Sequence, residues 1–287
     1  MNPCLRKFSS RGFLVPDKGA AKRKQRRREM KHLRRCLLTV AVMCCTTLSA
    51  QYSDILHLYA DSAARADKLT VTLDADILSK YVWRGYDLGD ISLQPELGLE
   101  WRGLRLSFSG TTPLNNSRDD QYEFNIQLNY SIGHLALGVY DQWSEGTDGR
   151  YFNYKLPGTS HTFEASVAYD FGFAQLAWAT NFAGWDHWAT PDEEDPEYYG
   201  YRTFSSYIEA AVPFTYQDIE WVATLGIVPW KSFFYYTRTL AVTNIALKGT
   251  YDIPVTKKFS LPVFAEFIAN PRQEHFYFVL GASLSLF

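Results

Sequence analysis

The sequence predicts an all-β protein, an antiparallel up-and-down transmembrane β-barrel of about 12 strands that follows a cleavable signal peptide. Three observations predict this fold. From residue 68 on, segments of about ten residues alternate apolar and polar side chains, which is the period of strands with two unlike faces. The breaks between segments alternate between tight and long. Aromatic residues gather at segment ends, as in the interfacial girdles of membrane barrels; examples are Tyr81, Trp83, Trp101, Tyr130, Trp143 and Trp178.

The first 50 residues predict export. They hold 13 of the 29 Lys and Arg residues but only Asp17 and Glu29 as acids, and they contain all four Cys and all three Met. We interpret residues 1–29 as a basic N-terminal extension that precedes a start at Met30, in preference to a nucleic-acid-binding patch. Residues 30–50 have the positive start, apolar centre and small final residues of a signal peptide. Residues 51–67 then form a periplasmic linker and residues 68–287 the outer-membrane barrel.

The composition of residues 51–287 excludes several classes of function. This part has no Cys, so a disulfide scaffold, a zinc finger and Cys catalysis are excluded. Its 16 basic and 29 acidic residues give a net charge of −13, which argues against nucleic acid as a partner. No run of about 18 apolar residues occurs, which argues against membrane-spanning helices. We expect no cofactor and no metal.

The expected strands follow from the alternation, which is clearest over 122–130, 163–171, 219–227 and 276–284. In order they are 69–84, 92–101, 103–111, 121–132, 134–143, 161–171, 173–182, 204–214, 219–228, 239–252, 259–268 and 275–287. Tight connections at Gly103, Gly133 and Gly172 alternate with longer ones, up to the stretch 184–202. An even strand number places both chain ends on the periplasmic side, and the last residue, Phe287, is aromatic, as is common in outer-membrane barrels. A soluble β-sandwich or lipocalin-like barrel has the same period and is the alternative, but the girdles and the loop rhythm favour the membrane barrel.

If the apolar stripe meets lipid, the charged stripe lines the lumen. The expected inward residues are Asp74, Asp76, Lys80, Arg84, Glu96, Glu100, Arg105, Glu123, Glu164, Glu209, Glu220, Asn244, Lys248 and Glu266. On segment 239–252 we expect Ala241, Thr243, Ile245 and Leu247 to face lipid. The inward charges either line a water-filled pore, whose acid surplus favours cations and whose narrowest point is set by Arg84, Arg105 and Lys248, or they pair and close the lumen.

The start of the barrel resembles a known family. Ser79, Tyr81, Arg84 and Gly85, followed by Gln94 and Pro95, resemble the opening motif of the TorF-type porin family of conserved hypothetical outer-membrane β-barrel proteins. The resemblance covers roughly the first two strands. It implies an outer-membrane barrel with pore activity and gives no substrate. We expect Gly85 to turn the chain out of the first strand and Arg84 to point into the barrel near its mouth.

The most distinctive expected outer loop carries Trp185, Trp188, Asp192, Glu193, Glu194 and Asp195. Its carboxylates could hold a divalent cation and its indoles could stack on a sugar, but the spacing fits no calcium-loop motif, so we interpret it as a solvated extracellular loop. A lipid hydrolase needs a Ser and a His on one face. Ser160 and His161 point to opposite faces, and Ser144 and His161 also differ in face, so we expect no enzyme.

The sequence thus predicts a barrel in the bacterial outer membrane that allows passive diffusion of small hydrophilic solutes or ions, with a weak cation preference. Its expected partners are outer-membrane lipids, lipopolysaccharide and, during biogenesis, the barrel-assembly machinery. The alternatives are a closed structural barrel, a barrel that binds partners through its outer loops and, less favoured, an outer-membrane lipid hydrolase.

Overall fold

A computed structural model of the protein describes residues 68–115, 122–145, 149–156, 158–187, 201–257 and 259–285. These residues belong to one compact unit, 44–287. The predicted N-terminal extension, signal peptide and linker lie outside the described residues, as do Phe287 and most of the stretch 184–202. The described part of the chain contains no helix long and apolar enough to cross a membrane.

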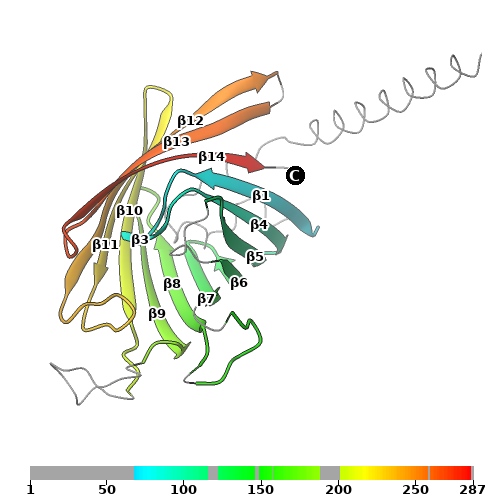
Figure 1. Ribbon diagram of the computed structural model, residues 1–287. Helices are drawn as coiled ribbons and strands as arrows, with labels where there is room; N and C mark the ends of the chain where they lie inside the picture. Colours follow the sequence, from blue (N-terminus) through cyan, green and yellow to red (C-terminus); the bar gives the residue numbers. More distant parts are fainter. Residues whose placement is uncertain are drawn as a thin grey trace, which may run out of the picture. The chain divides into compact units, whose positions relative to one another are not determined.

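Twelve antiparallel strands close into a barrel (Figure 1). They are β1 (Thr70–Leu78), β4 (Ser92–Trp101), β5 (Leu104–Pro113), β6 (Glu123–Ile132), β7 (Leu135–Ser144), β8 (His161–Asp170), β9 (Gln175–Gly184), β10 (Ser206–Tyr216), β11 (Ile219–Val228), β12 (Ala241–Thr256), β13 (Phe259–Asn270) and β14 (His275–Ser285). Each strand pairs with the next along the chain, and β1 pairs with both β4 and β14, which closes the barrel. The predicted all-β antiparallel barrel of twelve strands is confirmed.

The alternation of the sequence becomes an apolar outside and a polar inside. On β6, Phe124 and Leu128 are exposed on the outer surface, whereas Asn125 and Asn129 are buried. The same parity places other exposed residues on the outer surface, among them Leu137, Val167, Leu225, Ile245 and Phe278. Since successive side chains of a strand point to opposite faces, the register that places the apolar residues outside also places the polar residues inside.

The connections at the two ends of the barrel differ in length. At one end, which we call the short-turn end, β4–β5 and β10–β11 are joined by Arg102-Gly103 and Gln217-Asp218, and all four residues have positive φ. That conformation gives the two-residue turn that matches strand twist. At the opposite, long-loop end lie the connections 79–91, 114–122, 145–160, 185–205 and 229–240, together with the four-residue turn 271–274. The predicted rhythm of short turns and long loops is confirmed.

The predicted first strand, 69–84, is wrong at its end. The barrel strand β1 stops at Leu78, and the chain then forms a hairpin of two short strands, β2 (Tyr81–Trp83) and β3 (Tyr86–Gly89). Gly85 therefore closes this hairpin and does not turn the chain out of strand one. The alternation of the sequence continues past Leu78 and therefore does not reveal the break. Tyr81 and Trp83 pack against residues of the barrel interior instead of facing lipid.

A bulge in β12 corrects a second prediction. Ala241 and Thr243 were expected to face lipid, yet they are 8% and 0% exposed. The pairing of β11 with β12 skips Thr243, because Gly226 pairs with Asn244 and Ile227 with Val242. A one-residue bulge reverses the facing of every residue beyond it. Ile245 and Leu247, on the other side of the bulge, are exposed as predicted.

Candidate functional site

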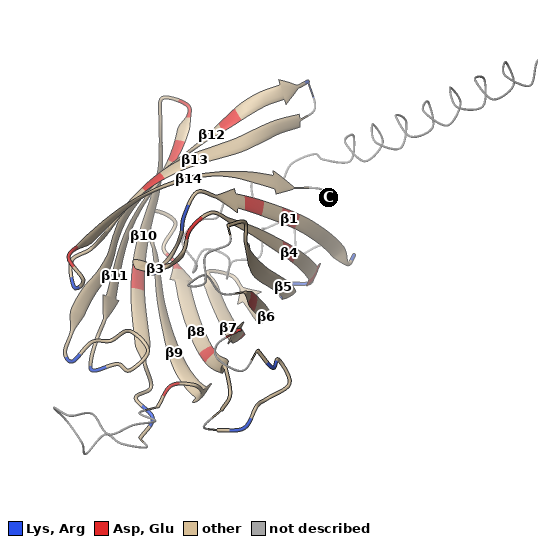
Figure 2. Cartoon of the chain, viewed as in Figure 1, with Lys and Arg blue, Asp and Glu red and all other residues tan. Residues whose placement is uncertain are grey.

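The interior of the barrel carries the charges that the alternation predicted. Carboxylates outnumber cations on the inward-facing stripe: Asp74, Asp76, Glu96, Glu100, Glu123, Glu164, Glu209, Glu220 and Glu266 stand against Arg105 and Lys248 on the described strands. Figure 2 shows acidic segments recurring along strands, whereas most basic segments lie in turns and loops. The inside of the barrel is therefore both polar and acidic.

The hairpin formed by β2 and β3, which we call the lumen hairpin, crosses the interior. At its tip, Arg84 contacts Glu164 on β8. The carbonyl oxygen of Gly85 accepts a hydrogen bond from Asn270 Nδ2 on β13 at 3.0 Å. Nearer its base, the Tyr81 hydroxyl donates to Glu123 on β6 at 3.0 Å. Because β6, β8 and β13 occupy separate parts of the barrel wall, the hairpin spans the lumen between them (Figure 1).

Local sequence explains the shape of this hairpin. Arg84 and Gly85 have φ values of 51° and 85°, so they form a tight turn of the hairpin-favouring type between Trp83 and Tyr86. Glycine is required at position 85 for a second reason. A Cβ atom there would lie 1.8 Å from the carbonyl oxygen of Thr243 on β12.

Arg84 forms a nearly fully buried ion pair with Glu164 on β8. Its Nη1 and Nη2 atoms donate to the two carboxylate oxygens of Glu164 at 2.6 and 2.8 Å, and the two side chains are 4% and 5% exposed. The guanidinium carbon also lies 4.3 Å from the ring centroid of Trp83 and 4.7 Å from that of Tyr207. Two parallel charge-assisted hydrogen bonds and two aromatic faces fix the guanidinium in position.

Tyr235, from the loop 229–240, completes the surroundings of Arg84. Its hydroxyl accepts a hydrogen bond from Arg84 Nη1, and its carbonyl oxygen accepts one from the Tyr86 hydroxyl at 2.6 Å. The ring is 1% exposed, and this burial raises the pKa of the Tyr235 hydroxyl, so the group stays neutral. The lumen hairpin and the loop 229–240 thus meet inside the barrel.

A buried aspartate holds the loop 229–240 in place. Asp186 is fully buried and accepts hydrogen bonds from the backbone N–H of Ser205 at 2.9 Å and from the hydroxyls of Ser205 and Thr203. Ser232 donates to the Ser205 hydroxyl at 2.7 Å, which connects this network to the loop. Trp185 packs nearby against Phe233, with ring centroids 4.9 Å apart.

The other predicted constriction cations stand in separate interactions. Arg105 on β5 pairs with both Glu96 and Glu100 on β4. Lys248 on β12 lies opposite Glu266 in the pairing with β13, and its Nζ is 3.9 Å from the ring centroid of Phe264. Arg84 thus pairs with Glu164 on β8 and Arg105 with β4, while Lys248 lies beside Glu266 and Phe264 of β13.

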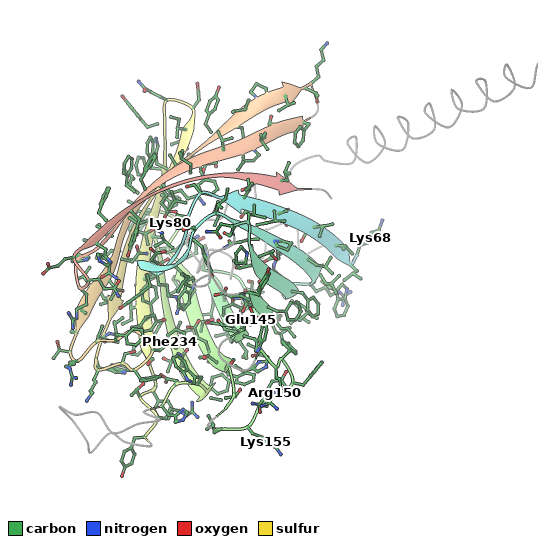
Figure 3. The ribbon with its side chains drawn as sticks, viewed as in Figure 1. Lys68, Lys80, Glu145, Arg150, Lys155 and Phe234 are labelled. Carbon is green, nitrogen blue, oxygen red and sulfur yellow. The ribbon has the colours of Figure 1, made fainter. Side chains whose placement is uncertain are left out.

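A cavity of about 170 Å³ remains beside the lumen hairpin. It is lined on the hairpin by Lys80, Tyr81 and Arg84 and on the wall by residues that include Asp74, Asp76 and Arg105. Lys80 is tied within the hairpin segment, since its Nζ lies 2.8 Å from Asp87 and 3.1 Å from Asp90 (Figure 3). The cavity is thus bounded by the acidic wall on one side and by the hairpin on the other.

The residues of the resemblance motif gather at this feature. Ser79 pairs with Leu280 on β14 through its backbone N–H and its hydroxyl, and Gln94 donates to Thr111 at 3.4 Å. Pro95 lies in β4 opposite Ala75. Tyr81, Arg84 and Gly85 make the cross-lumen contacts described above. Tyr207, which faces Arg84 from β10, shares the parity of Glu209, whereas Tyr235 lies in the loop 229–240, where no period identified it.

The remaining outer-loop predictions are only partly described. Trp185 packs against the loop 229–240 as stated, while Trp188, Asp192, Glu193, Glu194 and Asp195 lie outside the described residues. Within the described ranges there is no group of three or more His, Cys, Asp or Glu side chains that could hold a metal ion. Of the predicted girdle residues, Trp101, Tyr130 and Trp178 are exposed, Tyr81 and Trp83 lie in the lumen hairpin, and Trp143 is covered by Tyr151.

His161 lies on the outer face of the barrel near the long-loop end. Its Nδ1 is 2.7 Å from a carboxylate oxygen of Asp141, and its Nε2 contacts the carbonyl oxygen of Tyr151. The ring stacks on Tyr154 at 4.1 Å, beneath the loop segment 149–156, which carries Arg150 and Lys155 at its far end (Figure 3). Both ring nitrogens of His161 therefore have partners, a carboxylate on β7 and a backbone carbonyl of the loop.

Comparison with known proteins gives distant structural similarity only. No family model matches the chain, and none of the curated proteins matches its sequence. Solved structures similar to this chain include the porin NanC, with a TM-score of 0.40, 12% identity, and coverage of 74% of this chain and 97% of that chain. An outer membrane channel from Pseudomonas putida F1 has a TM-score of 0.36, 12% identity, and coverage of 79% and 98%. Outer membrane phospholipase A from Escherichia coli has a TM-score of 0.35, 14% identity, and coverage of 76% and 93%.

Proposed function

We propose that this protein is a channel of the bacterial outer membrane that passes small hydrophilic solutes or ions and prefers cations. The single observation that carries the proposal is the combination of an apolar outer surface with an acidic interior in one closed barrel. A soluble barrel would bury its apolar stripe and expose its charged one. The resemblance of the Ser79–Gly85 region to the TorF-type porin family agrees with this proposal.

Aromatic residues support the membrane placement. Near the short-turn end Trp101, Tyr130, Tyr169, Phe171 and Tyr216 are exposed on the outer surface, and near the long-loop end Tyr122, Phe204, Trp230 and Phe276 are exposed. Aromatic side chains favour the two membrane–water interfaces. With the predicted signal peptide, the short-turn end would face the periplasm and the long loops the cell exterior.

The cation preference rests on luminal charge. Arg105 is matched by Glu96 and Glu100, and Arg84 by Glu164, and the cavity wall carries Asp74, Asp76 and Glu266 in addition. Rings or walls of carboxylates raise the local concentration of cations and lower that of anions. No particular solute follows from these residues, because carboxylates attract inorganic and organic cations alike.

One observation favours the second candidate, a closed structural barrel. The lumen hairpin crosses the interior and is held by a nearly fully buried ion pair. If the hairpin closes the lumen and never moves, the barrel passes no solute and its outer loops would carry the function.

Planar-bilayer recording separates the two candidates. The protein would be expressed from its full coding sequence, purified from outer membranes and shown to be folded by heat-modifiable migration. Discrete conductance steps above those of detergent controls, at two salt concentrations, are expected of a channel. A silent bilayer with a folded barrel would favour the closed barrel.

A further inference from the structure

We propose that the lumen hairpin is the gate of the channel and that the Arg84–Glu164 ion pair is its latch. This inference rests on the proposed channel function and adds how passage through the lumen is controlled.

The contacts of the hairpin separate into internal and external ones. Internally, Lys80 bridges Asp87 and Asp90, and β2 pairs with β3. Externally, polar contacts with the wall include that of Tyr81 and those of the tip, where Arg84 meets Glu164 and Gly85 meets Asn270, and the rings of Trp83 and Tyr86 pack with Tyr207 and Tyr235. Because the segment is held together internally, it can leave the wall as a unit when these contacts break.

The ends of the segment are firmly joined to the barrel. Ser79 hydrogen-bonds to Leu280 on β14, and the backbone N–H of Leu114 donates to Ile91 at 2.9 Å. These bonds hold the base of the hairpin at the long-loop end while the tip lies inside the lumen. The hinge therefore lies between Ser79 and Lys80 on one side and near Asp90 on the other.

The chemistry of the latch suits reversible opening. A buried ion pair loses the hydration of both ions, so its net contribution to the closed state is small, whereas removal of one partner leaves the other charge buried and unpaired. When the hairpin swings out, Arg84 and Glu164 both regain water. The intact pair thus specifies the closed position without making it permanent, and a single-partner variant favours the open position.

The other luminal ion pair provides a matched control. Arg105 pairs with Glu96 and Glu100, but all three residues belong to adjacent wall strands, so this cluster does not fasten the hairpin. Arg105→Ala and Arg84→Ala remove the same charge from the lumen. Only Arg84→Ala removes a connection between the hairpin and the wall.

The test uses a single cysteine on the hairpin, since the sequence has no Cys after residue 50. Val82→Cys places a thiol of similar size on β2, where the side chain is partly buried. A membrane-impermeant methanethiosulfonate reagent then reports how often the hairpin leaves the lumen. The protein without the Val82→Cys change is the labelling control, and the Val82→Cys protein is the parent for all further changes. Heat-modifiable migration shows that each variant is folded.

In this background, Arg84→Ala and Glu164→Gln are expected to raise the labelling rate by about tenfold or more, because a partnerless buried charge disfavours the closed position. Arg105→Ala is expected to leave the rate near that of the parent. The charge-exchanged double variant, Arg84→Glu with Glu164→Arg, is expected to restore slow labelling at least in part. Equal labelling rates in the parent, Arg84→Ala and Glu164→Gln would overturn the proposal that this ion pair holds the hairpin in the lumen.

Conductance then separates failure of the gate from failure of the channel. Arg84→Ala is expected to conduct more than Arg105→Ala, and replacement of residues 80–90 by a short Gly-Ser linker is expected to conduct most. If labelling accelerates while every variant, including the linker replacement, is silent in bilayers, the hairpin moves but the barrel is no channel. If the parent conducts and the linker replacement conducts no more, the hairpin is not the gate.

Discussion

At the residue scale, two kinds of position carry this structure, and they differ in how visible they are in the sequence. Charged residues on strands, such as Asp76, Glu164 and Lys248, were placed in the interior by parity alone, because a strand side chain has only two directions available. Loop residues such as Tyr235 and Asp186 are just as buried, yet no period identifies them. Their burial depends on which loops fold inward, which is set by tertiary contacts.

Gly85→Ala tests how tightly the hairpin tip is seated. Alanine at positive φ costs about 1–2 kcal/mol, and here its Cβ would also collide with the Thr243 carbonyl. Gly172→Ala is the matched control, since Gly172 has the same φ of 85° but nothing within 4 Å of an added Cβ. We expect Gly85→Ala to lower the urea midpoint of unfolding clearly more than Gly172→Ala. Equal midpoints would mean that the tip is not packed against β12.

Asp186→Ala tests the network that holds the outer loops. The change leaves the Ser205 backbone N–H and two hydroxyls without their acceptor, and such a loss costs about 1–3 kcal/mol for each buried donor. We expect faster protease cleavage in the segments 201–205 and 229–240 of the folded barrel. Asp252→Ala, at an exposed position of β12, serves as the control and should leave the cleavage rate unchanged. Similar cleavage of both variants would argue against the network.

At the scale of elements, the twelve barrel strands could be predicted from the sequence, whereas the lumen hairpin could not. Alternation reports that a segment is extended and has two unlike faces, and it runs without interruption from β1 through Tyr81 and Trp83. What separates β2 from β1 is the set of partners that these rings find inside the barrel, including the stacking of Trp83 on Tyr235. The bulge at Thr243 could not be predicted either, because one extra residue in a strand does not change its composition.

The ribbon formed by the ends of β12 and β13 extends beyond its neighbours at the short-turn end. From Asp252 to Thr256, β12 pairs with β13 alone, and these residues are exposed. We expect that replacing residues 253–261 by a two-residue Asn-Gly turn leaves the folded barrel intact, because no third strand packs there. Heat-modifiable gel migration measures this. Loss of the folded band would show that the ribbon supports the barrel wall.

At the scale of the whole molecule, the separation of apolar outside from acidic inside links the fold to the proposed function. Asp74 and Asp76 line the cavity from β1, whereas Glu96 and Glu164 are held in ion pairs with Arg105 and Arg84. We expect the double variant Asp74→Asn with Asp76→Asn to reduce cation preference markedly. Asp218→Asn, at an exposed position in the turn between β10 and β11, is expected to leave the preference unchanged. A loss of preference in both variants would indicate an effect of total charge instead of luminal charge.

The reversal potential of the purified protein in a planar bilayer with a salt gradient tests the central claim most directly. An open, acid-lined lumen predicts discrete conductance steps and a reversal potential displaced toward the Nernst potential of the cation. A reversal potential displaced toward that of the anion would contradict the acidic lining as the selective element. A bilayer that stays silent even after the lumen hairpin is replaced by a linker would contradict the channel itself.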